Sequence, residues 1–394
     1  MAKVLISSIG TGDKNKGYNK TNYKIDGKLY ENEIFIANVL SRHLSIDKLF
    51  LIGTEKSIWD AVYSKFGGDE KTEFKIYEQQ EKGNLQSIIN LIESQIDKTL
   101  KTKGSRCFII KYGVDEIELW DNFSKFLEIA SGLEEKDEIY LDITHSFRSL
   151  SLMSFVMSEF TSNTRENPLN IKGIYYGMLE LSRENDGTTP IINLSMFFEL
   201  LEWGKAIRSL KIYGNSKDLL RLINKTEDKK DIKNAFNDFS NALNMSDMLA
   251  LQKAVRNLYT KIKFFTESEN EIYKIIGKEL LSFINRLNVE EFHIFQYELA
   301  KWYQENQNYP LSYVVLVEAV VSAIAKRDGL DSNKKKDNIF IKEIAQNEYK
   351  YFECIREIRN GIAHALENNK EIIENEDAIK NLPKYIKDLF YLFE

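Results

Sequence analysis

Along the first half of the chain, short runs of apolar and β-branched residues alternate with segments whose apolar residues recur every three to four positions. The short runs of buried type lie at 4–9, 48–52, 107–110, 139–143 and 171–176, with a weaker run at 73–77. Strands that alternate with helices predict a mostly parallel sheet covered on both faces. We therefore expect residues 1–195 to form a Rossmann-like α/β domain.

From about residue 196 the strand pattern stops and helical spacing continues to the end. The expected helices lie at 196–213, 216–224, 230–244, 247–266, 270–287, 289–305, 312–327, 339–360 and 377–392, with a polar loop at 328–337. A chain of 394 residues also exceeds what one hydrophobic core usually serves. The predicted fold class is therefore α/β plus all-α, with a helical region at 196–394.

Composition limits the class of protein. Cys107 and Cys354 are too few for a disulfide framework or a zinc cluster and favour a reducing cytoplasm. No signal peptide follows Met1, and the apolar runs read from the sequence are shorter than the roughly 20 residues of a membrane span, so we expect no membrane partner. A net charge of −6, without a basic recognition helix, disfavours DNA as a partner. It says little against an enzyme that contacts a few nucleotides of single-stranded RNA.

Near the carboxyl end the chain reads Arg359-Asn360-Gly361-Ile362-Ala363-His364, an R-N-x-x-x-H string. Histidine can exchange the proton of a 2′-hydroxyl near neutral pH, and arginine holds phosphate oxygens through a planar fork of donors. Together they supply what RNA cleavage needs without a metal. The spacing alone is weak, because about one such sequence in eight contains it by chance. A helix with a solvated arginine and a packed histidine is the other interpretation.

Polar residues also follow two of the predicted strands. Ligands of open parallel sheets lie outside the carboxyl ends of the strands. The turn Gly10-Thr11-Gly12 can present backbone N–H groups to an anion. The second segment joins a strand to a helix, where free N–H groups favour phosphate, and carries Thr144, His145, Ser146 and Arg148. A capped helix with a structural Asp142–His145 hydrogen bond is the alternative.

The stretch 18–28 has two interpretations. It can form a loop over the strand-end site, in which tyrosines such as Tyr23 stack on bases and lysines meet phosphates. It can equally form an exposed hairpin. The sequence leaves both open.

Four segments of the first half resemble the CARF domain of CRISPR-associated ancillary ribonucleases of type III systems. They are V-L-I-S-S-I-G-T-G at 4–12, Y-x-x-T-x-Y-x-I-D-G-K at 18–28, G-T-E-K-S-I-W-D at 53–60 and L-D-I-T-H-S-F-R-S-L at 141–150. The R-N-x-x-x-H string is similar to the catalytic motif of the HEPN domain that such proteins carry at their carboxyl end. Ser146 departs from the family pattern, which more often has glycine there.

The resemblance implies a metal-independent endoribonuclease that cleaves single-stranded RNA when a cyclic oligoadenylate binds. It implies a homodimer or higher oligomer, with the nucleotide ring bound across two CARF domains, no other cofactor, and tetra-adenylate favoured on family grounds alone. The implied catalytic residues are Arg359, Asn360 and His364. The implied ligand contacts are Gly10, Thr11, Gly12, Tyr23, Thr144, His145, Ser146 and Arg148.

Two alternatives accompany this hypothesis. The CARF-like site can itself degrade the ring, alone or in addition to RNA cleavage, as a ring nuclease. The chain can also be a ligand-sensing binding module without catalysis. Ring size, RNA sequence preference and assembly beyond a dimer are not specified by the residues.

Overall fold

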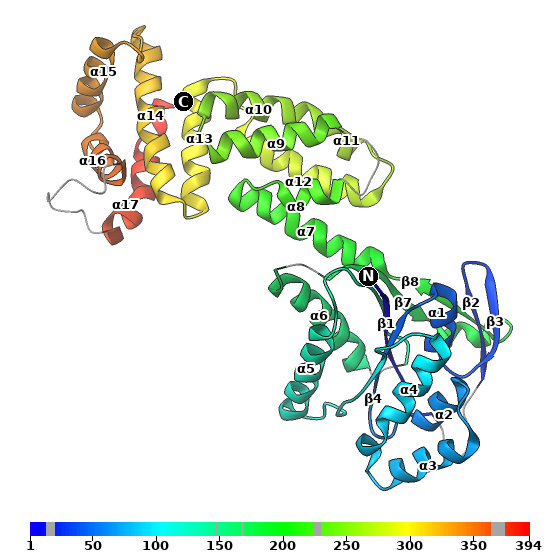
Figure 1. The fold of residues 1–394 in the computed structure, drawn as a ribbon. Helices are drawn as coiled ribbons and strands as arrows, with labels where there is room; N and C mark the ends of the chain where they lie inside the picture. Colours follow the sequence, from blue (N-terminus) through cyan, green and yellow to red (C-terminus); the bar gives the residue numbers. More distant parts are fainter. Residues whose placement is uncertain (13–19, 146–147, 167–168, 224–229, 364–374) are drawn as a thin grey trace. The chain divides into compact units, whose positions relative to one another are not determined.

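The computed structural model describes residues 1–12, 20–145, 148–166, 169–223, 230–363 and 375–394. His364, Ser146 and Tyr18 fall outside this part of the chain. The described residues form two compact units, Met1–Phe198 and Glu199–Glu394, coloured from blue to green and from green to red in Figure 1.

The first unit is built on one eight-stranded sheet with the order β3-β2-β8-β7-β6-β1-β4-β5. Five parallel strands make up its larger part: β1 (Lys3–Ser8), β4 (Lys48–Gly53), β5 (Arg106–Ile109), β6 (Glu138–Asp142) and β7 (Ile171–Gly177). They correspond to the five stronger apolar runs. The mostly parallel sheet predicted from the sequence is therefore confirmed.

Helices cover both faces of this sheet. The side chains of each strand point alternately to the two faces and so contribute to the core under each helical layer. Val4 and Ile6 of β1 belong to the core under α5 (Glu116–Ser131) and α6 (Arg148–Thr164), whereas Leu5 belongs to the core on the opposite face. Successive side chains of a strand point to opposite faces, so a continuous apolar run serves two cores. The opposite face is covered by α1 (Ile36–Leu44), α2 (Trp59–Lys65), α3 (Glu70–Glu81) and α4 (Ile89–Leu100), which follows a short η1 (Leu85–Ser87).

Three further strands extend the sheet beyond the five that correspond to the stronger apolar runs. β8 (Thr188–Asn193) is antiparallel to β7, and β2 (Thr21–Ile25) and β3 (Lys28–Glu33) form a hairpin whose first strand pairs with β8. The hairpin turn is Asp26-Gly27, both with positive φ, the conformation that tight hairpin turns require. The described residues of 18–28 form a hairpin, but it joins the sheet and buries Tyr23 and Ile25, so it is not the exposed hairpin of the second interpretation.

The prediction of a weak strand at 73–77 was wrong, because these residues lie within α3. The side chain of Asp69 accepts a hydrogen bond from the N–H of Thr72 and caps this helix. Helix-favouring Glu, Lys and Gln residues fill the helix, whose aromatic side chain at Phe74 is 61% exposed. A short apolar run alone does not distinguish a strand from a helix.

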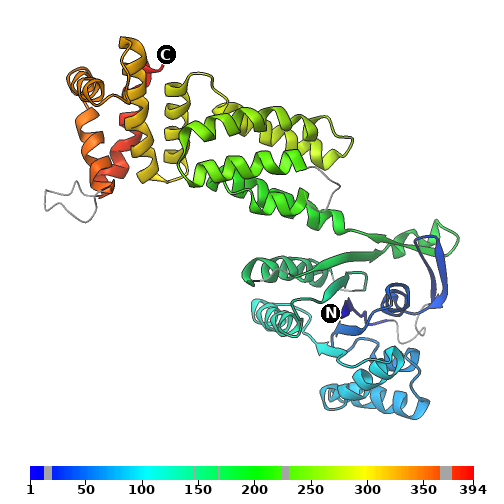
Figure 2. The ribbon, with the colours of Figure 1, turned by 45° about the horizontal axis from the view of Figure 1, so that its top comes forward.

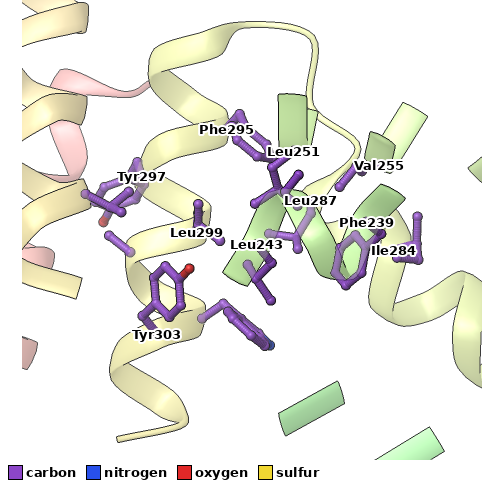
Figure 3. Close-up of a cluster of buried hydrophobic side chains, with 14 of the residues drawn as sticks. Phe239, Leu243, Leu251, Val255, Ile284, Leu287, Phe295, Tyr297, Leu299 and Tyr303 are labelled. Atoms are coloured by element: carbon purple, nitrogen blue, oxygen red, sulfur yellow. The ribbon is translucent and has the colours of Figure 1, made fainter. Parts of the chain in front are cut away.

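In the second unit every described segment of regular structure is helical, which confirms the all-α expectation. Its helices are α7 (Ser195–Tyr213, which begins just before the unit), α8 (Lys217–Ile223), α9 (Lys230–Asn244), α10 (Met248–Lys261), α11 (Lys263–Thr266), α12 (Glu271–Leu287), α13 (Phe292–Glu305), α14 (Tyr309–Asp328), α15 (Lys335–Glu348), α16 (Phe352–Ala363) and α17 (Asn375–Asp388), followed by η3 (Phe390–Leu392). Part of their shared core, with Phe239, Leu251 and Phe295 converging from three helices, is drawn in Figure 3.

Two expectations for this unit need correction. The helix expected at 339–360 is two helices, because Tyr349 has extended backbone and ends α15; its ring is buried and stacks on Tyr391 at 5.8 Å. In addition, α14 is long and apolar enough to cross a membrane by length and composition, contrary to the expectation that no run approaches that length. Of its apolar window, 61% is buried within the protein, as in the core helix of a globular unit.

Candidate functional sites

The two predicted strand-end segments lie side by side at one edge of the sheet. β1 and β6 are parallel neighbours, so the turns that follow them leave the sheet together. A Cβ placed on Gly10 would lie 3.7 Å from the carbonyl oxygen of His145, which shows how closely the two turns approach. Thr11 is partly exposed, like Gly10, and Gly12 is exposed, with a φ of 66° in the region that favours glycine.

His145 is partly exposed at this edge and is hydrogen-bonded to Tyr23. The Nε2 atom of His145 lies 3.1 Å from the hydroxyl oxygen of Tyr23, whose side chain has no exposed surface. Burial lowers the pKa of His145 to about 4, so its imidazole is neutral at pH 7. Tyr23 therefore contacts the site through its hydroxyl, and its ring is not available to stack on a base in this arrangement.

Asp142 ends β6 beneath the same edge. Its carboxylate accepts hydrogen bonds from the hydroxyl of Ser7 and from the N–H of Thr144, the latter at 3.0 Å. Burial nevertheless raises the pKa of Asp142 to about 6, because the two hydrogen bonds offset only part of the desolvation of the charged form. The described hydrogen bonds of Asp142 and His145 run to these separate partners, rather than to one another as in the structural alternative.

The side chain of Thr144 also makes a structural hydrogen bond. Its Oγ1 accepts a hydrogen bond from the N–H of Gly177 at 2.8 Å, which ties the end of β6 to β7. Arg148 is the first residue of α6, and the structure describes its backbone only. Ser146 lies outside the described residues.

The segment 53–60 is hydrogen-bonded to the backbone of the glycine turn. Ser57 Oγ donates to the carbonyl of Ile9 at 3.0 Å and accepts from the N–H of Thr54, while the N–H of Ile58 donates to the carbonyl of Gly10 at 3.1 Å. These residues were not among the predicted site residues. The signal that identifies them is the G-T-E-K-S-I-W-D string itself, which places a small hydroxyl residue opposite a glycine turn.

In the second unit, Arg359 and Asn360 lie together on α16. Arg359 Nη1 donates to Asn360 Oδ1 at 3.2 Å, and Nη2 lies 3.5 Å from Oε1 of Glu318 on α14. Arg359 Nε is inaccessible and has no hydrogen-bond partner among the described residues. His364 lies outside them. Glu318 was missed by the sequence reasoning, although it is the single charged residue between 309 and 325.

Comparison with known proteins identifies the family to which the chain belongs. Residues 4–180 match the family model described as CRISPR system endoribonuclease Csx1, CARF domain, and residues 199–291 match CRISPR-associated protein MJ1674, second domain. CRISPR-associated protein MJ1674 of Methanocaldococcus jannaschii is 33% identical over 439 residues, which cover 99% of this chain and 68% of that protein. The chain belongs to the MJ1674 family. It is thus a CARF-containing CRISPR ancillary protein, as the sequence motifs predicted.

The chain also aligns with a solved structure. Enterococcus italicus Csm6 bound to cyclic hexa-2′-fluoro-hexa-dAMP is 14% identical, with 100% of this chain and 94% of that chain covered and a TM-score of 0.44. The MJ1674 second-domain match covers the helices at 199–291, for which the sequence motifs gave no assignment.

Proposed function

We propose that this member of the MJ1674 family is a cytoplasmic RNA endoribonuclease of type III CRISPR defence, activated by cyclic oligoadenylate and independent of metal. The observation that carries the proposal is the pairing of Arg359 and Asn360 on one helix, with Glu318 holding the guanidinium. The match of residues 4–180 to the CARF domain of an endoribonuclease supports it, because this match precedes the helical region in the chain.

Cleavage would proceed by attack of a ribose 2′-hydroxyl on the adjacent phosphorus. His364 moves the proton, Arg359 neutralises the extra negative charge on the pentacoordinate phosphate, and Asn360 orients the reacting groups. The 5′-oxygen leaves, which gives a 2′,3′-cyclic phosphate and a 5′-hydroxyl. Residues five apart on a helix lie about 140° apart around its axis, so two motifs paired about a twofold axis would complete the site.

The activator would bind at the edge formed by the two strand-end turns. Thr11 and Gly12 lie at accessible positions there, and Arg148 begins the helix that follows. A neutral His145 would contribute a hydrogen bond rather than a charge, and Tyr23 fixes the orientation of the imidazole. Tetra-adenylate is the proposed ring, on family grounds.

An apolar face on α6 supports the proposed homodimer. Leu152, Val156 and Phe160, at successive turns of the helix, are 65%, 52% and 45% exposed. Between residues 149 and 164 the sequence has one charged residue, Glu159. Helices that face water normally present charged side chains, so this stripe is typical of a helix that packs against another chain.

The neighbouring helix α5 extends this face. Its Trp120 packs edge-on against Phe123 at 5.3 Å between ring centroids, and Phe123 packs in the same way against Phe160 of α6 at 5.8 Å. The two helices lie side by side in Figures 1 and 2. The exposed apolar side chains of the pair supply on the order of 500 Å² of surface, a large part of the roughly 800 Å² that one partner contributes to a stable interface.

The position of this face favours a second copy of the chain as its partner. The helix α6 begins directly after the turn that contains Thr144 and His145. A twofold-related copy packed on α6 therefore brings two strand-end sites close together. A ring with twofold symmetry suits such a paired site.

The test is RNA cleavage by the full chain in excess EDTA, with rings of three, four and six adenylates titrated separately. We expect cleavage that depends on one ring size and leaves 2′,3′-cyclic phosphate ends. Arg359→Ala and His364→Ala should abolish cleavage with unchanged ring binding. Strict metal dependence, or equal activity of these variants, contradicts the proposal. Ring loss that persists in His364→Ala would show that the CARF site itself cleaves the activator.

A further inference from the structure

Two lysine side chains from separate elements converge on one tyrosine near the start of α16. Lys350 Nζ lies 5.2 Å from the ring centroid of Tyr351, and Lys384 Nζ of α17 lies 4.9 Å from the same centroid. The ring of Tyr351 also contacts that of Tyr385 at 5.1 Å, which fixes α17 against this point. Tertiary packing, rather than local sequence, therefore brings the two ammonium groups together.

Some lysines of the chain form ion pairs with glutamates, whereas these two ammonium groups have no carboxylate partner among the described residues. Lys205 and Lys301, for example, each lie 2.7 Å from a glutamate oxygen. Among the described residues, neither Lys350 nor Lys384 has a carboxylate oxygen within 4.0 Å. The nearby ammonium groups of Lys384 and Lys350 lower the pKa of Tyr351, and Asp388 acts on Lys384 only at longer range. Two positive charges thus lie beside one phenol ring without a carboxylate in direct contact.

The position of this cluster relates it to Arg359. The carbonyl of Tyr351 accepts the N–H of Ile355 at 3.0 Å, so Tyr351 stands at the amino end of α16. Arg359 follows eight positions later, which corresponds to about 12 Å along the helix axis and about 80° around it. Tyr351, which the two lysines flank, and Arg359 therefore lie about two turns apart along α16.

We propose that Lys350, Tyr351 and Lys384 form a phosphate subsite that binds the backbone of the RNA substrate beside the phosphate held by Arg359. The inference rests on the proposed ribonuclease function and adds to it a substrate-binding site. Ammonium groups neutralise a phosphodiester as point charges, and the phenol adds a hydrogen-bond donor. Such contacts set the register of a strand and carry no base preference.

The test measures binding of the full chain to a 2′-O-methylated single-stranded RNA, which lacks the attacking hydroxyl, with saturating cyclic tetra-adenylate. The double variant Lys350→Ala/Lys384→Ala should bind about tenfold more weakly, and the slope of log K against log salt should fall in magnitude by about 0.7, the value for one lost phosphate contact on a single strand. The matched control is Lys335→Ala/Lys336→Ala, which removes two exposed lysines of the same unit. Lys350→Arg/Lys384→Arg should keep the wild-type slope.

Each other outcome decides against the subsite in a recognisable way. A double variant with the slope of its control overturns it and leaves the ribonuclease proposal standing. A lower melting temperature, or a changed affinity for cyclic tetra-adenylate, with an unchanged RNA slope assigns the lysines a structural or activator-related role instead. A wild-type chain that neither binds nor cleaves RNA overturns the subsite and the proposed function together.

Discussion

Glu318 and Arg359 contact one another although they stand 41 residues apart on different helices, with 3.5 Å between Oε1 and Nη2. Glu318 is the single charge in the apolar stretch 309–325, where a carboxylate is costly to accommodate. Both side chains are about one-third exposed, and ion pairs with such exposure add little to stability. The contact is therefore better explained by the orientation of the guanidinium, whose other terminal nitrogen is held by Asn360.

Replacing Glu318 should reduce catalysis more than binding. We expect Glu318→Ala to lower kcat for activated RNA cleavage about tenfold with little change in KM, because a hydrogen bond to a charged group contributes about 1.5 kcal/mol or more. Glu318→Gln should recover part of the loss, since its amide oxygen still accepts a hydrogen bond. Steady-state kinetics of the two variants, with melting temperature as the control for folding, give the answer. A variant more active than wild type would show that Glu318 restrains Arg359.

The apolar stripe of α6 should be needed for dimerisation. Val156→Glu places a charge in the middle of that stripe, and an unpaired charge buried in an interface is strongly unfavourable. We expect the variant to sediment as a monomer and to lose activation by cyclic oligoadenylate. Ile275→Glu, at another exposed β-branched position on α12, is the control and should sediment like wild type. A Val156→Glu chain that stays dimeric places the dimer contact elsewhere.

The strand-end site shows which relationships a sequence can predict. The apolar runs at 4–9 and 139–143 identify two strands, and parallel neighbours deliver their following turns to one edge, which is how Gly10 and His145 come together. The Tyr23–His145 bond was not predictable in this way, because it depends on a hairpin that joins the sheet through β8. Such a pairing is long-range and leaves no local periodicity.

In the helical unit, too, the sequence predicted local elements but not the contacts between distant residues. Helical periodicity located most helices, yet it ran across the break at Tyr349, since a buried aromatic residue fits a helical stripe and a helix end equally well. The apolar pattern of α14 likewise gave no reason to single out Glu318. Only the packing of α14 against α16 shows that its carboxylate faces Arg359.

Two glycines near the strand-end site should respond differently to the same substitution. A Cβ on Gly53 would lie 2.7 Å from Ile9 Cγ1 and 2.9 Å from Ser57 Oγ, in a region without space to adjust. We therefore expect Gly53→Ala to destabilise the protein by about 1–3 kcal/mol, as overpacking generally does. A Cβ on Gly10 meets its nearest atom at an ordinary 3.7 Å, so Gly10→Ala should fold normally and alter activator affinity alone. Thermal unfolding and ring-binding titrations of the two variants separate these effects, and equal melting temperatures would contradict the packing argument.

The free energy of unfolding should depend on pH in opposite ways through Asp142 and through His145. Burial holds the pKa of His145 at about 4 against an ordinary 6.5, so its contribution to stability is complete above pH 6.5 and is lost as the pH falls towards 4. The pKa of Asp142 is raised to about 6 from 3.8, so its folded state is penalised above pH 6 and relieved as the pH falls. Each effect amounts to roughly 3 kcal/mol, and in the wild type they nearly cancel between pH 6 and 4.

Removing either group should break this cancellation in a direction fixed by the remaining one. Asp142→Asn leaves His145 alone, so the free energy of unfolding should fall by roughly 3 kcal/mol between pH 6.5 and 4. His145→Gln leaves Asp142 alone, so the free energy of unfolding should rise by a similar amount over the same interval. Urea unfolding of the first unit, followed by hydrogen exchange of β1 and β6, measures both. If the free energy of unfolding of both variants changed with pH in the same way, Asp142 and His145 would be solvated in the folded protein. Burial is what raises the pKa of a carboxyl group and lowers that of an imidazole.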